Sequence, residues 1–176
     1  MPSYYTYLIA SLPALSFGMK PSFSLEEFFS LCARHIPETD LARIKEAVEK
    51  PDYQLNNQEL PFLKKWHQFN LALRTELARL RAGRKKVDPL QYVREEVFIP
   101  SEVMHAANSA YRNLSLLDAE KILDLARWHF LEENSLGHFF DLETLIAYAL
   151  KLKILWRWER INSCPKQEQL EKIIAD

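Results

Sequence analysis

The residues that could do acid–base or metal chemistry are scattered along the chain. A di-metal carboxylate site in a helical bundle needs two Glu-x-x-His pairs on neighbouring helices, and Glu102 with His105 forms one such pair without a second. No H-E-x-x-H motif, cysteine ligand cluster or calcium loop occurs in the sequence. We therefore predict no metal site and no cofactor. The histidines of the chain are His35, His67, His105, His129 and His138.

His129 is the strongest candidate for a catalytic residue, because Glu132 and Glu133 follow it by about one helical turn. A histidine beside carboxylates can serve as a general base. A histidine on the charged surface of a helix is much the commoner explanation of this pattern. We therefore predict that the protein is not an enzyme, and keep a site around His129 and Glu132 as the least favoured hypothesis.

The glycines exclude most nucleotide-binding motifs. The chain has three of them, Gly18, Gly83 and Gly137, and no two are close enough in sequence to share a loop. The phosphate loop, the dinucleotide-binding fingerprint and the G-x-S-x-G nucleophile elbow all need closely spaced glycines. The sequence therefore predicts none of these chemistries.

The elements that position these residues are helices in a chain of 176 residues. This length favours one domain, or two small lobes at 1–88 and 89–176. The net charge is -1, and the two cysteines have no C-x-x-C companion, which favours free thiols in a reducing compartment. The apolar run 142–158 carries four charged residues, so we expect no membrane span and a cytoplasmic location.

Helical periodicity covers most of the first half. Ser24 and Glu27 form a capping box before a helix that Pro37 ends, and a second helix is predicted over Thr39–Glu49. A long helix is predicted to begin near Asn56 and Asn57 and to stop at Gly83. One face of it carries apolar residues at helical spacing: Phe62, Trp66, Phe69, Leu73, Leu77 and Leu80.

The second half continues the pattern. Short helices are predicted after Asp88-Pro89 and after Pro165, with a longer one from Pro100-Ser101 to about Arg112. Ser115 with Asp118, and then Asp141, cap two further helices. The first is expected to bury Leu116, Ala119, Leu123, Ala126 and Phe130, and the second to be the most buried helix, with apolar residues at Leu142, Leu145, Ala149, Leu152 and Trp156.

The predicted fold class is all-α, an irregular bundle of about seven or eight helices. Residues 1–20 fit this pattern least. Tyr4, Tyr5 and Tyr7 could belong to an extended aromatic strap across the helices or to one more helix, and both alternatives stay open.

Charge is distributed unevenly. Residues 24–60 have a net charge of -4, whereas residues 61–94 have +7. Five cations fall in eight residues at the end of the long predicted helix. One interpretation is a solvated helix end, where cations interact favourably with the helix dipole. The other is a binding site for an anionic partner, formed by Arg79, Arg81, Arg84, Lys85 and Lys86.

Trp156 and Trp158 lie two residues apart on the last long helix. Side chains at i and i+2 point in directions about 200° apart, so both cannot face the same side of the helix. We predict that one of them faces a groove, a second lobe or a partner, because aromatic residues are favoured anchors at protein interfaces.

Three stretches together resemble an uncharacterised bacterial family whose genes lie among those for V-type ATPase subunits. They are residues 4–13, residues 77–82 and residues 126–141, and residues 145–152 extend the likeness. The resemblance covers nearly the whole chain. It implies a role in these rotary ion-pumping machines.

A second resemblance is to a repeating element of the funnel subunit of V-type ATPases, the all-helical funnel that seats the central shaft on the membrane ring. It rests on residues 69–71, 81–84 and 98–100. The two resemblances imply a non-enzymatic, cytoplasmic, peripheral component of the ATPase, similar to the funnel subunit or an assembly factor. Its partners would be the central shaft and the membrane rotor ring, which would hold it at the inner membrane. The alternative is a free-standing helical adaptor or nucleic-acid-binding module that uses residues 79–86.

Overall fold

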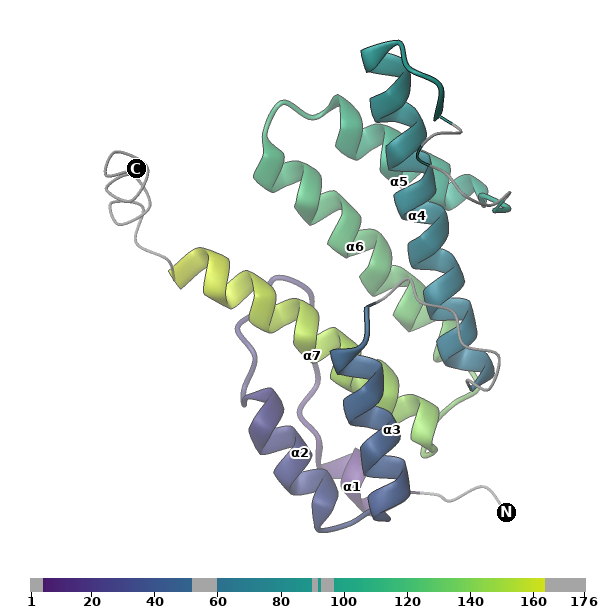
Figure 1. The fold of residues 1–176 in the computed structure, drawn as a ribbon. Coiled ribbons are helices and arrows are strands. Elements are labelled where there is room, and N and C mark those ends of the chain that lie inside the picture. Colours follow the sequence, from purple (N-terminus) through teal and green to yellow (C-terminus); the bar gives the residue numbers. More distant parts are fainter. Residues whose placement is uncertain (1–4, 52–59, 90–91, 93–96, 164–176) are drawn as a thin grey trace. The chain divides into compact units, whose positions relative to one another are not determined.

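The computed structural model describes residues 5–51, 60–89, 92 and 97–163. Seven α-helices account for most of these residues, and no strand occurs among them (Figure 1). The prediction of an all-α bundle is therefore confirmed. The chain divides into two compact units, unit 1 (residues 1–48 and 138–176) and unit 2 (residues 49–137). These limits differ from a boundary at residue 88, and the single domain with lobes at 1–88 and 89–176 stays a prediction.

Unit 1 is organised around α7 (Leu142–Ser163). Its helix-spaced apolar residues continue around most of the helix, so α7 is buried over most of its circumference, as the sequence predicts. Three shorter helices belong to the same unit: α1 (Thr6–Ser11), α2 (Leu25–Ala33) and α3 (Glu38–Glu49). The capping box of Ser24 and Glu27 at the start of α2 is present in both directions.

The N-terminal region combines the two alternatives that the sequence left open. It forms the short helix α1 and then runs without helix from Leu12 to Ser24. Side chains of α7 hold this run, because Tyr148 Oη donates to the Pro13 carbonyl at 2.9 Å and Trp156 Nε1 donates to the Phe23 carbonyl at 2.8 Å. Burial raises the pKa of Tyr148 to about 12, so the phenol keeps its proton at neutral pH.

Unit 2 contains α4 (Pro61–Lys85), α5 (Ser101–Arg112) and α6 (Leu116–Asn134). In Figure 1, α5 and α6 lie beside each other, and α5 also packs against α4. The buried face of α5 is built from small residues, which allow its neighbours to approach closely. Together these helices bury the core Phe69, Ala72, Leu73, Val103, Ala106, Ala107, Ala110 and Leu123.

A buried polar network ties α6 to α4. Arg127 donates to Asp124 at 2.7 Å within α6 and to the Asn70 side chain of α4 at 2.8 Å. Asn70 in turn donates to the Trp66 carbonyl at 2.9 Å. Asp124 and Asn70 are buried, so their polar atoms need these partners, and the network fixes the register of the two helices.

Two predicted helix positions are corrected. α4 begins at Pro61, with Leu60 as its N-cap, while Asn56 and Asn57 lie outside the described residues. Proline suits this first position because the N–H it lacks would have no helical partner there. The short helices expected after Asp88-Pro89 and after Pro165 fall mostly or wholly outside the described part of the chain.

The predicted face of α6 is partly wrong. Leu123 is buried, but Leu116 is 78% exposed, and Ala119, Ala126 and Phe130 are half-buried. The residues that α6 buries are Leu123, Asp124, Trp128 and Leu131. The regular apolar spacing did not reveal that a polar network would turn the Asp124 side of the helix inward.

Hydropathy along the described helices agrees with the expectation of no membrane span. None of these helices combines the length and the hydropathy that crossing a bilayer requires.

Candidate partner-binding groove

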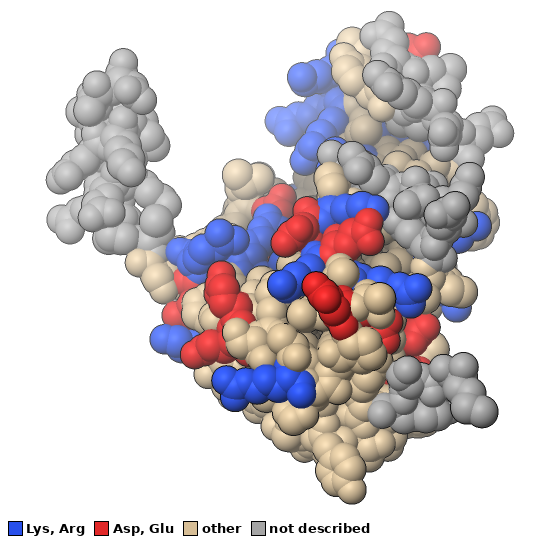
Figure 2. Space-filling model, turned by 60° about the horizontal axis from the view of Figure 1, so that its bottom comes forward, with Lys and Arg blue, Asp and Glu red and all other residues tan. Residues whose placement is uncertain are grey.

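The five predicted cations lie at the C-terminal end of α4. Arg79, Arg81, Arg84 and Lys85 belong to its last two turns, and Lys86 follows as the C-cap. All five residues are exposed. Figure 2 shows Lys and Arg atoms gathered in the upper, more distant part of the view, whereas basic and acidic atoms alternate over the nearer part.

The end of α4 differs from the prediction. Gly83 is helical rather than the stop, and Lys86 has a left-handed backbone with φ of 55°. The Lys86 N–H bonds to the Ala82 and Gly83 carbonyls, and the Val87 N–H bonds to Ala82 at 3.1 Å. These bonds satisfy the last helical carbonyls. Within the described residues, Lys86 is the one non-glycine with positive φ, a conformation that is unusual for a side-chain-bearing residue.

Three of the five cations line a groove with a volume of about 520 Å³. Arg81, Arg84 and Lys85 of α4 form one side of it. Apolar side chains complete the lining and come from all three helices of unit 2 and the α5–α6 turn: Leu77, Ala110, Leu114, Leu116, Ala119 and Leu123. The basic cluster is therefore the charged edge of a partly apolar groove.

The tight turn between α5 and α6 places two leucines at this groove. Asn113 is the C-cap of α5, and its side chain accepts from the Ser115 N–H at 2.9 Å. Ser115 caps α6 by accepting from the Asp118 N–H at 3.2 Å. This confirms the Ser115 cap, although Asn113 rather than Asp118 binds the Ser115 N–H. Leu114, between the two capping residues, is fully exposed at 104%.

The charges of the groove are not neutralised within the described part of the chain. Arg79 lies 4.0 Å from Glu76, the limit of an ion pair. Among the described residues, no ion pair joins a carboxylate to Arg81, Arg84, Lys85 or Lys86. Glu120 is the one acidic side chain among the described residues that line the groove. An anionic ligand would thus meet several unpaired cations.

The two predicted interface tryptophans belong to unit 1. Trp158 is buried, and the indole of Trp156 is half-buried and donates to the Phe23 carbonyl. As expected for i and i+2, their environments differ. A role for either in binding a partner stays a prediction.

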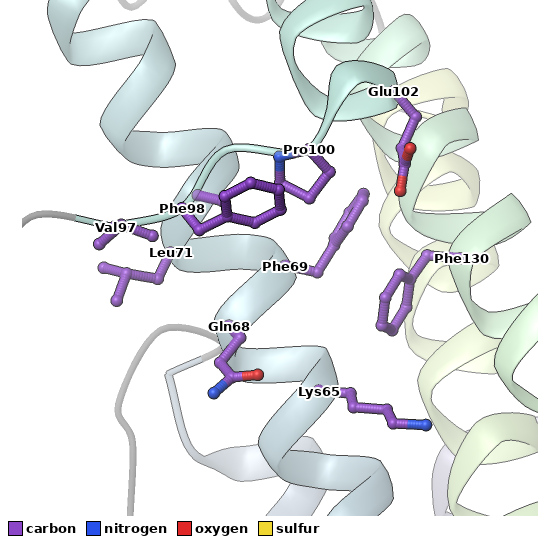
Figure 3. A pocket seen from close by; sticks show the side chains of 10 residues that line it. Lys65, Gln68, Phe69, Leu71, Val97, Phe98, Pro100, Glu102 and Phe130 are labelled. Carbon is purple, nitrogen blue, oxygen red and sulfur yellow. The ribbon is translucent and has the colours of Figure 1, made fainter.

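A second pocket of about 440 Å³ lies beside α4 and the segment before α5 (Figure 3). Phe98 and Pro100 approach Phe69, which stacks on Phe130 with ring centroids 4.4 Å apart. Phe98 is 85% exposed. Two of the stretches that resemble the funnel subunit, residues 69–71 and 98–100, therefore meet at this pocket.

The histidine candidates lie elsewhere. His129 is exposed and lines a groove of about 710 Å³ with His105, while Glu132 accepts from the Trp128 indole at 2.8 Å. The acidic residues Glu102 and Glu133 line the same groove. It contains no described cluster with three ligand atoms close enough for a metal ion.

One group of described residues does have metal-ligand spacing: His138, Asp141 and Glu143. Asp141, however, caps α7 by accepting from the Thr144 N–H at 3.1 Å, and it contacts His138 Nδ1 at 2.6 Å. Burial raises the pKa of Asp141, but hydrogen bonds from His138 and Thr144 outweigh it and lower the pKa below its usual value. The positive end of the helix dipole favours this carboxylate and opposes a cation.

The cations of the groove are evident in the sequence, whereas its leucines are not. The sequence places Leu114 in a turn and predicts a buried Leu116, yet both are among the most exposed leucines described. The signal that could have found them is an apolar residue between two capping residues, Asn113 and Ser115, where no helical neighbour could cover it.

Comparison with known proteins adds a family. No curated protein and no solved structure matches the chain. One family model matches residues 52–176, which include all of unit 2 from residue 52 on and α7. The groove and the pocket of Figure 3 both lie within the matched region. On this match, the chain belongs to DUF2764, described as a family of proteins of unknown function.

Proposed function

We propose that this protein is a non-enzymatic peripheral component of a bacterial V-type ATPase. It would act as a connector similar to the funnel subunit, between the central shaft and the membrane rotor ring, or as an assembly factor for that connection. Its mechanism would be adhesive and mechanical, in that a stiff helical body binds partner subunits and transmits force without binding nucleotide.

The observation that carries the proposal is the exposed basic end of α4. Arg81, Arg84 and Lys85 face a groove and have no carboxylate partner among the described residues. A solvated helix end needs no groove beside it. A surface that binds an acidic partner gains both electrostatic steering and apolar contact from this arrangement.

The resemblance to V-type ATPase proteins supplies the identity of the partner. The stretches that resemble the funnel subunit all belong to unit 2, and residues 69–71 and 98–100 meet at one pocket. They thus form one local structure, which is what a shared structural element requires.

Affinity purification of the tagged protein from its own cells, followed by mass spectrometry, tests this function. We expect stoichiometric recovery of the catalytic and rotor subunits of the ATPase. Recovery of the protein without any ATPase subunit would contradict the proposal.

The rival function is a helical adaptor or nucleic-acid-binding module, and the same unpaired cations favour it. It predicts binding to RNA or DNA whose affinity falls as salt rises, because counterions are released from the phosphates. A gel-shift assay at low salt distinguishes the two functions. We expect no shifted band.

A further inference from the structure

The geometry points to a specific occupant for the groove of unit 2: an acidic, amphipathic helical segment of a partner protein, which we propose binds with its apolar side against the leucines and its carboxylates against the cations. This inference rests on the proposed function in taking the basic end of α4 as a binding surface. It adds the leucines as part of the site and defines the chemistry of the partner segment.

The first argument is the pattern of the groove. One side carries Arg81, Arg84 and Lys85, whereas Leu114 and Leu116 are exposed apolar residues on the lining contributed by the turn and α6. A ligand that satisfies both sides must present negative charge and apolar side chains on different faces. A helix with apolar residues at i, i+3, i+4 and i+7 does this.

The second argument is the exposure of the leucines. Leu114 is 104% exposed and Leu116 is 78% exposed, and they lie two residues apart on either side of the Ser115 cap. Exposed apolar residues beside a concave surface mark binding sites more often than isolated ones do. Both side chains would lose contact with water when the groove is occupied, which favours binding.

The third argument is the backbone of Lys86. Its positive φ turns the chain at the end of α4, directly after the cations of the groove. Strained backbone that persists in a folded protein is found more often at functional sites than elsewhere. A lysine at this position keeps a fifth cation beside the groove, where a glycine would give the same turn without the charge.

A protein segment is favoured over a lipid surface by the shape of the site. The groove is concave, with a volume of about 520 Å³ between three helical elements. This volume suits a few inserted side chains. A flat membrane surface would contact the rim and leave the buried floor at Leu123 unoccupied.

The test is selection from a random peptide library displayed on phage, with peptides of roughly 16 residues, about four turns of helix. The full chain is the target. We expect the selected peptides to be acidic, with apolar residues at helical spacing. Their affinity, measured on synthetic peptides, should fall about tenfold or more for the double variant Arg81→Glu, Arg84→Glu.

Two further variants separate the parts of the site. Leu114→Ser with Leu116→Ser should also weaken peptide binding about tenfold, because the apolar contacts are lost without change of charge. Lys64→Glu with Lys65→Glu is the matched control, since both lysines are exposed on the first turn of the same helix, away from the groove. It should leave peptide affinity unchanged.

Selected peptides that are neutral or basic, or that bind the groove variants and the control equally, would overturn the inference. So would binding to vesicles of phosphatidylglycerol and phosphatidylcholine that depends on Arg81 and Arg84 when no acidic peptide is selected. Selection of acidic peptides together with purification of no ATPase subunit would leave the inference standing and remove the proposed function.

Discussion

Lys86 has a backbone conformation that glycine adopts with much less strain. Its φ of 55° ends α4, and the N–H groups of Lys86 and Val87 satisfy the last carbonyls of the helix. A side chain in this conformation costs about 1 kcal/mol relative to glycine. The charge of Lys86 lies next to the groove cations, so stability and binding make opposite demands on this residue.

Replacing Lys86 with glycine is therefore expected to raise the free energy of unfolding by about 1 kcal/mol. Urea denaturation followed by circular dichroism measures this. Lys85→Gly is the matched control, since Lys85 is the last helical residue and the same change there should lower stability. A loss of stability in Lys86→Gly would show that the left-handed backbone imposes no strain.

Cys32 is a buried free thiol on α2. Burial raises its pKa from 9.0 to about 12. The folded state therefore holds a proton that the unfolded state releases between these values. The contribution to stability is complete below pH 9 and is lost as pH rises toward 12.

The consequence is low reactivity of Cys32 toward a thiol reagent such as DTNB, because the thiolate is the reactive species. In a Cys164→Ser variant, where Cys32 is the remaining thiol, we expect slow modification of native protein at about pH 8 and fast modification in urea. Equal rates in the two states would contradict the burial of Cys32.

The elements of unit 2 are held by an apolar core and one polar network. Arg127 is 17% exposed and Asp124 is 2% exposed, so the ion pair lies in a largely dry environment. Breaking a buried pair by removing one partner leaves the other charge uncompensated. The network joins α6 to Asn70 of α4, so its loss affects both helices.

Asp124→Ala is expected to cost about 3 kcal/mol of unfolding free energy, the lower end of the range for buried pairs because Arg127 keeps some contact with water. Thermal or chemical denaturation measures the loss. Lys20→Ala is the comparison, because Lys20 and Glu159 form an exposed pair at 3.4 Å. That change should cost less than about 1 kcal/mol. Equal costs for the two variants would contradict the role of the network.

Most helices could be predicted from sequence because local signals determine where they begin and end. Ser24 with Glu27, Pro100 with Ser101, Ser115 and Asp141 all lie where the predicted caps are. These signals act over three or four residues and need no tertiary context. Gly83 misled because a glycine can also be tolerated inside a helix, and the turn came three residues later at Lys86.

The site was predicted in part for a related reason. A cluster of cations is visible in sequence, whereas a groove depends on which helices meet. Leu116 has the spacing of a buried residue, but in the first turn of α6 no described neighbouring element covers it. Apolar spacing identifies a face and does not show whether another helix packs on that face.

At the scale of the whole molecule, two compact units divide the residues of interest. The groove lies in unit 2, whereas Trp156 and Trp158 lie in unit 1. The matched family region includes both sets of residues. A connector between two partners would use a separate surface for each, and unit 2 supplies the one with unpaired charge.

The central claim is that the basic groove of unit 2 binds an acidic partner in the ATPase. The most direct test compares the ATPase subunits recovered with tagged wild-type protein, with Arg81→Glu, Arg84→Glu and with the control Lys64→Glu, Lys65→Glu. The account predicts that the first variant loses most of the recovered subunits, while its melting temperature and the control's recovery stay unchanged. Unchanged recovery with Arg81→Glu, Arg84→Glu, or an equal loss with the control, would contradict it.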